Sequence, residues 1–183
     1  NPDVIRLSIQ RVREWIAAHP DASAYSVSQN DNADWCECEQ CASLGPTTSD
    51  RLLQFVNRIA RELPDKTIDT LAYQDTRRPP RSTVPAPNVL IRFCPIEACQ
   101  AHALGRCRES IDAFHDYEGW RRTAKHIVLW RYSANFAHFL APFPNLSAVA
   151  TDLQLPRIDG AFVQGAGSGP LSDGAELRAY LAA

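Results

Sequence analysis

Short apolar segments alternate with stretches of helical periodicity along the chain, and this alternation restricts the possible folds more than any other feature. Strands are predicted at residues 24–28, 67–73, 88–93, 126–132 and 160–164. Helices are predicted from Asn1-Pro2 to the break at His19-Pro20, at about 49–63, 109–125 and 146–155, and from Asp173 onward. A loop rich in Pro and Arg is predicted from Arg77 to Pro87. The expected core contacts of the helix at 109–125 are Ile111, Phe114 and Trp120. Strands that alternate with helices form a parallel sheet with helices packed against it, so the fold class is α/β.

A doubly wound sheet and a (β/α)8 barrel both fit this alternation. No Gly-rich phosphate-binding fingerprint follows a strand, which disfavours a dinucleotide-binding sheet. A barrel would need about three more strands than the chain supplies. The 183 residues contain no methionine and stop inside a helical pattern. We therefore expect residues 1–183 to be a fragment of a single TIM-barrel-like domain, a partial (β/α)8 fold whose N-terminal strands and further domains lie outside it and whose unpaired strand edges promote aggregation in isolation.

Charge and hydropathy exclude two classes of partner. The net charge is −2 at pH 7, so the chain lacks the basic bias of a nucleic-acid-binding protein. No apolar run approaches the roughly 20 residues that a membrane-spanning helix requires.

Polar and aromatic residues gather where the predicted strands end. In parallel α/β folds these ends form the functional face. The residues expected there are Gln29, Asn30, Asp31, Asn32, Tyr73, Gln74, Asp75, Cys94, Glu97, Trp130, Arg131, Tyr132, Asn135 and Gln164. Carboxylates and amides bond sugar hydroxyls, and aromatic rings stack on the apolar faces of sugars, so the set suits a carbohydrate site.

Asp31 is the first candidate for a catalytic carboxylate, with Asn30 beside it. Its flanking amides could orient the carboxylate or hold a substrate acetamido group, although an Asn-Asp-Asn run is also typical of a turn or helix cap. Asp75 and Glu97 are weaker candidates. Glycosidases use two carboxyl groups, or one acid with the substrate's own amide, and the sequence presents no obvious pair.

Aromatic residues near the same ends could form a sugar platform. The candidates are Trp35, Tyr73, Trp130, Tyr132 and Phe136. Trp130 alternates with core residues on its strand and is as well explained by the core. Trp35 lies in a polar loop, which favours exposure and function.

Six cysteines fall into two groups: Cys36, Cys38 and Cys41, then Cys94, Cys99 and Cys107. The first group could give three thiolates to a structural zinc, with a fourth ligand from Cys94, Cys99, His102 or Cys107. Disulfides are the alternative and would suit an exported protein. The two groups follow different strands at the same end of the sheet, so they could meet.

Several motifs, in order, resemble those of one family. They are Tyr25-Ser26-Val27-Ser28-Gln29-Asn30-Asp31-Asn32 with Cys36-x-Cys38-x-x-Cys41, then Phe55-Val56-Asn57, Leu71-Ala72-Tyr73 with Pro79-Pro80, Asn88-Val89, Trp130 to Tyr132 with Asn135-Phe136, Pro142 to Leu146, Phe162 to Gly165, and Glu176 to Tyr180. Together they resemble domain of unknown function 4838 (DUF4838), which includes glycoside hydrolase family 163.

The resemblance implies a TIM-barrel-like fold in exported bacterial proteins, whether secreted, periplasmic or on the cell surface. Characterised members are endo-β-N-acetylglucosaminidases that act on the N-glycans of glycoproteins. The expected partner is thus a glycan or glycoprotein, with no cofactor required beyond a possible structural zinc. Asp31 would be an acid/base or acetamido-orienting residue, with Asn30 and Gln29 contacting substrate.

Two positions depart from the family pattern. Acidic residues often stand at the positions of Arg131 and Val163, so this protein could act on another substrate or be inactive. The alternatives are therefore a non-catalytic carbohydrate-binding barrel, and a scaffold stabilised by a cysteine–zinc cluster.

Overall fold

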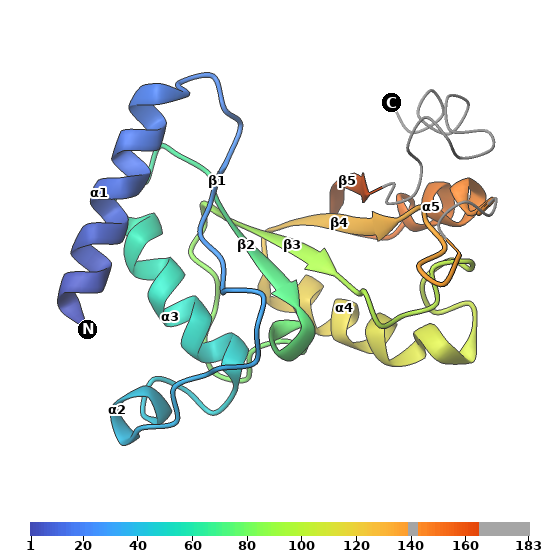
Figure 1. Ribbon diagram of the computed structural model, residues 1–183, viewed down its shortest axis with the longest axis horizontal. Helices are drawn as coiled ribbons and strands as arrows, with labels where there is room; N and C mark the ends of the chain where they lie inside the picture. Colours follow the sequence, from blue (N-terminus) through green and yellow to red (C-terminus); the bar gives the residue numbers. More distant parts are fainter. Residues whose placement is uncertain (139–142, 165–183) are drawn as a thin grey trace.

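The computed structural model describes residues 1–138 and 143–164, and these form an α/β unit whose strands and helices alternate (Figure 1). In chain order the elements are α1 (Pro2–Ala18), β1 (Tyr25–Ser26), α2 (Glu39–Ala42), α3 (Thr48–Arg61), β2 (Ile68–Tyr73), η1 (Gln74–Thr76), β3 (Val89–Cys94), η2 (Arg108–Ser110), α4 (Ile111–Thr123), β4 (His126–Tyr132), α5 (Leu146–Asp152) and β5 (Ile158–Gln164). Each predicted strand is present. The helix predicted from Asp173 lies outside the described residues.

The five strands form one sheet in which every neighbouring pair is parallel, as predicted. Their order in the sheet, β1-β2-β3-β4-β5, is their order in the chain. Doubly wound sheets reverse direction at a switch point, whereas the strands of a (β/α)8 barrel follow one another around the wall. The described sheet therefore has the strand order of an arc of such a barrel.

One face of the sheet holds the hydrophobic core. Ile91, Phe93, Ile127 and Leu129 on this face are fully buried. Helix α3 packs against β2 and β3, and Tyr117 of α4 meets the Phe93 ring edge-on at 6.1 Å between centroids. On the opposite face Leu90, Arg92, Val128 and Trp130 are only half-buried, so these side chains are available for another role.

The core positions of α4 differ in part from those expected. Trp120 is buried and Phe114 packs against the core, as predicted. Ile111 was also expected in the core, and this is wrong, because 38% of its surface is exposed. Ile111 is the first residue of the helix, and the helix buries Ala113 and Tyr117 instead.

The predicted loop between residues 77 and 87 is fastened to α3 by a buried carboxylate. Asp50 accepts hydrogen bonds from the backbone N–H groups of Arg81, Ser82 and Thr83, at 2.7 to 3.1 Å. Thr47, the N-cap of α3, donates its hydroxyl to the same carboxylate at 2.7 Å. Burial opposes ionisation, but these hydrogen bonds hold the pKa of Asp50 well below its usual range.

We expect Asp50→Asn to lower the free energy of unfolding at pH 7 by roughly 1.5–3 kcal/mol, the usual contribution of a hydrogen-bonded charge. Because the pKa of Asp50 is lower in the folded state, its contribution is complete above the unfolded value of about 4 and is lost as the pH falls below it. Urea unfolding at pH 7 and pH 3 should show a smaller difference between wild type and variant at pH 3. Asp65→Asn, at an exposed turn, should change neither value.

Arg131 and Val163, the two departures from the family pattern, are register partners on β4 and β5. Arg131 is fully buried, and its Nε lies 3.1 Å from Oδ2 of Asp152 on α5. The guanidinium also donates to the carbonyl oxygens of Gln100 and His102, at 3.2 and 2.9 Å. Arg131 is therefore a packing residue between β4 and α5, and it does not line the cavity described below.

No helix in the described ranges has both the length and the apolar character needed to cross a membrane.

Candidate functional site

A cavity of about 320 Å³ opens at the carboxyl ends of the strands. It is lined by Gln29, Asn30, Asp31, Leu71, Tyr73, Cys94, Ile96, Trp130, Tyr132, Phe136 and Gln164. These residues come from β2, β3, β4, β5 and the loops that follow β1, β3 and β4. The cavity thus occupies the sheet face opposite the helices.

The lining contains many of the residues that the sequence predicted and adds two. Gln29, Asn30, Asp31, Tyr73, Trp130, Tyr132 and Gln164 lie together here, with Phe136. Leu71 and Ile96 were not predicted. Leu71 looks in the sequence like any apolar strand residue, and only the alternation of faces along β2, with Tyr73 two positions later, could have placed it in the cavity.

Asn32, Trp35, Asp75 and Asn135 are not among the lining residues. The Trp35 indole donates to the Asp75 carboxylate at 3.1 Å and packs against the core. The Asn135 side chain accepts from the backbone N–H groups of Ala137 and His138. Trp35 and Asp75 thus join the loop after β1 to η1, and the Asn135 side chain bonds within its own loop.

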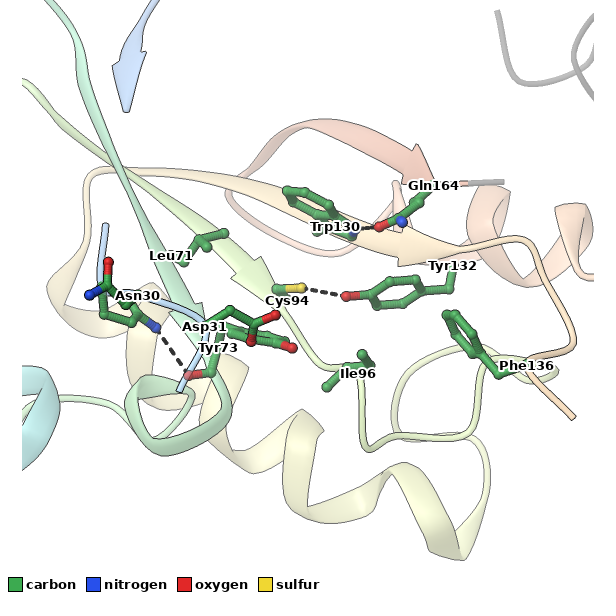
Figure 2. A pocket seen from close by; sticks show the side chains of 11 residues that line it. Asn30, Asp31, Leu71, Tyr73, Cys94, Ile96, Trp130, Tyr132, Phe136 and Gln164 are labelled. Atoms are coloured by element: carbon green, nitrogen blue, oxygen red, sulfur yellow. Dashed lines mark hydrogen bonds between the residues drawn. The ribbon is translucent and has the colours of Figure 1, made fainter. Parts of the chain in front are cut away.

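One wall of the cavity is aromatic (Figure 2). The Trp130 ring lies 6.4 Å from that of Tyr132, which meets Phe136 edge-on at 5.4 Å. Trp130 also contacts Phe162 at 4.4 Å, and its Nε1 donates to Gln164 at 3.2 Å. Trp130 therefore faces the cavity side of the sheet, as the platform interpretation requires, and not the core.

Asp31 lies beside Tyr73, across the cavity from the aromatic wall (Figure 2). The loop is attached to η1 by Gln29, whose Nε2 donates to Thr76 Oγ1 at 2.9 Å. Burial first, and then the negative charge of Asp31, raise the pKa of Tyr73, so its hydroxyl stays protonated at neutral pH. The site thus pairs a carboxylate with a hydroxyl that can donate.

The backbone next to Tyr73 is strained. Gln74 has φ of 49°, in the left-handed region that a residue with a β-carbon rarely adopts. Its side chain donates to the Tyr73 hydroxyl at 2.9 Å. Such strain is concentrated at functional sites, where surrounding contacts maintain it.

Glu97 stands on the loop after β3, near the cavity but outside its lining. Its carboxylate accepts from Arg77 at 2.8 Å, and Arg77 also binds Asp116 at 2.8 Å. Burial raises the pKa of Tyr73 and of Tyr132, and the negative charge of Glu97 adds a smaller contribution to both shifts. Glu97 is thus a second carboxylate at the rim, held in place by an arginine.

The cysteines do not assemble as one group. All six are free thiols, so the disulfide alternative does not describe this structure. Cys36, Cys38 and Cys41 form one set, and Cys99, His102 and Cys107 form another, with the ligand atoms of each set within 4.8 Å of one another. Each set could hold a metal ion. The sequence left open that the second group would complete the first, and in this structure the ligand atoms form two separate sets.

Cys94 belongs to neither set and is part of the cavity wall. Its Sγ lies 3.0 Å from the Tyr132 hydroxyl. Burial raises the pKa of Cys94 to about 11. At neutral pH it is therefore a neutral thiol that fixes the Tyr132 ring.

Thiol reactivity should separate Cys94 from Cys38. Hydrogen bonds from the backbone at Cys41 and from the Cys36 thiol lower the pKa of Cys38 to about 7. In metal-free protein at pH 7, iodoacetamide should therefore modify Cys38 first and Cys94 last, since the thiolate is the nucleophile. Peptide mass spectrometry over a time course measures the order. Equal rates at Cys38 and Cys94 would contradict these environments, and denatured protein, in which the rates should converge, is the control.

Comparison with protein families gives one match that covers the chain. The model described as "Domain of unknown function (DUF4838)" matches residues 1–183. A search of curated proteins finds no match.

Proposed function

Since the chain belongs to the DUF4838 family, we propose that it binds glycans containing N-acetylglucosamine in the cavity between Asp31 and Trp130 and hydrolyses a glycosidic bond there. The reaction would be of the endo-β-N-acetylglucosaminidase type, on glycoproteins met outside the cell. The observation that carries the proposal is the pairing of Asp31 and Tyr73 on one side of the cavity with an aromatic wall on the other.

The cavity has the two surfaces that a sugar ring requires. Trp130, Tyr132 and Phe136 offer flat apolar area for stacking, while Gln29, Asn30 and Gln164 offer amides for hydroxyl and acetamido groups. Its volume of about 320 Å³ is near the lower end of the range for small-molecule sites. It would thus enclose the sugar at the cleavage point and leave the rest of the glycan outside.

The carboxylates favour a reaction in which the substrate assists. Asp31 is the one carboxylate among the cavity-lining residues that the structure describes, and Glu97 stands at the rim. A glycosidase with one suitably placed acid can use the substrate's acetamido oxygen as the nucleophile. Asp31 would orient the acetamido group or act as acid/base, and Tyr73, kept protonated, would donate a hydrogen bond to it.

A structural metal is part of the proposal. Cys36 and Cys38 lie on the loop that also carries Asp31, and Cys41 lies in α2 directly after it. Three thiolates suit Zn²⁺. None of the three lines the cavity, so the metal would shape the loop and take no part in the chemistry.

The test is an assay of protein produced from the complete gene, on a glycoprotein with complex N-glycans, with released glycans read by mass spectrometry. Cleavage between the two core N-acetylglucosamine residues would support the proposal. If the folded protein releases no glycan, the proposed hydrolase activity is wrong.

A non-catalytic carbohydrate-binding domain is the second candidate, favoured by the single carboxylate among the described lining residues. Calorimetric titration with the same glycans separates the two. Binding without cleavage, weakened by Trp130→Ala, would establish the binding domain in place of the enzyme.

A further inference from the structure

The loop between β3 and α4 carries a second group of metal-ligand side chains, distinct from the cysteines near Asp31. Cys99, His102 and Cys107 bring two sulfurs and an imidazole nitrogen within 4.8 Å of one another. Cys99 Sγ and His102 Nδ1 are 3.2 Å apart. Tetrahedral zinc with the usual bond lengths separates a sulfur and a nitrogen ligand by about 3.6 Å, so an ion would fit with a small adjustment.

The backbone brings these residues together by a turn that requires glycine. Gly105 has φ of 76°, and a β-carbon there would lie 2.8 Å from the Phe114 ring. The turn folds Cys107 back toward Cys99, and Ser110 closes it by accepting from the Gly105 N–H at 3.2 Å. Two independent constraints at one glycine thus hold the loop in the shape that groups the ligands.

The surroundings also favour negatively charged ligands. The buried guanidinium of Arg131 donates to the His102 carbonyl at 2.9 Å, and the charges of Cys99 and Cys107 act on it. A buried positive charge beside the site favours the thiolate forms of Cys99 and Cys107, which are the forms that bind a metal.

From this geometry we infer that Cys99, His102 and Cys107 form a zinc site with three protein ligands. Binding replaces two S–H bonds by two Zn–S bonds and releases two protons to solvent, with no change of oxidation state. A water molecule would complete the tetrahedral coordination of the ion. The ion would fix the loop that carries Ile96 in the cavity wall and Glu97 at its rim.

The experiment uses full-length protein in which Cys36, Cys38 and Cys41 are all replaced by serine, stripped of metal and titrated with Co²⁺. We expect one equivalent to bind, with thiolate-to-cobalt charge-transfer absorption and the strong visible bands of tetrahedral cobalt. Saturation with Zn²⁺ should bleach both. No charge-transfer absorption, or a Cys99–Cys107 disulfide in protein purified under reducing conditions, would overturn the site.

Two further variants test the imidazole ligand. His102→Asn should release zinc to a competing chelator at least roughly tenfold more readily, because even partners outside the coordination sphere contribute this much. His115→Asn, an exposed histidine on α4, is the matched control and should bind zinc as the parent does. Unchanged retention in His102→Asn would remove His102 from the site.

Discussion

Replacing Asp31 by asparagine is expected to lower the rate of glycan hydrolysis by about 100- to 10,000-fold, the range that a positioned acid or base contributes. Asparagine has nearly the same shape, but it cannot exchange a proton or carry the charge that would orient an acetamido group. Asp31 is exposed and lies in a loop, so the fold should be unaffected. The measurement is the initial rate of release of N-glycans by the wild type and the variant, with circular dichroism on both.

Asp34→Asn is the matched control for this variant. Asp34 lies three positions along the same loop, is exposed, and does not line the cavity. It should keep full activity. Wild-type turnover in Asp31→Asn would remove Asp31 from the mechanism, whereas an equal loss in both variants would indicate an effect of loop charge.

Asp152→Ala is expected to destabilise the protein by about 3–5 kcal/mol, the usual cost of removing one partner of a buried ion pair. Arg131 is fully buried and Asp152 is 1% exposed, so the variant would leave an arginine charge in the core. The carboxylate also accepts from the Leu104 N–H at 2.7 Å, and this donor would lose its partner. Urea unfolding followed by circular dichroism gives the free-energy difference.

The double variant Arg131→Met, Asp152→Leu supplies the control. Replacing both charges with apolar side chains removes the unpaired charge, so the double variant should be more stable than Asp152→Ala alone. An Asp152→Ala variant as stable as the wild type would show that the pair contributes nothing. Because Arg131 contacts the carbonyl oxygen of the proposed ligand His102, loss of Asp152 should also weaken zinc retention.

The strands were predictable because the alternation of apolar residues in the sequence matches the burial of those residues in the fold. In β3 and β4 the apolar residues that alternate in the sequence are those buried under the helices. The end of α4 was also predictable. Ile111 was not, because its place within the helical period fits the core while the path of the chain into the helix turns it outward.

The site was predictable only where it depends on strand ends. Asp31, Tyr73 and Tyr132 each follow or end a strand, and parallel strands bring such positions to one edge. Trp35 shows the limit, since a tryptophan in a polar loop can bend back to a partner such as Asp75. The two cysteine sets show the same limit, because spacing along the chain does not reveal which loops are neighbours.

Strand β1 is short, and this affects how the protein binds a ligand. The strand is two residues long and, within residues 1–138 and 143–164, pairs with β2 alone. After β1, hydrogen bonds hold the segment that leads to Asp31. The Val27 N–H donates to the Asp69 carbonyl oxygen, and the Ser28 hydroxyl and the Gln29 amide each bond to the segment that contains β2 and η1. Because so few bonds attach it, this segment opens locally at a fraction of the free energy of global unfolding. We therefore expect Asp31 to sample several positions in the free protein, and a ligand that selects one of them would give up part of its binding energy to that ordering.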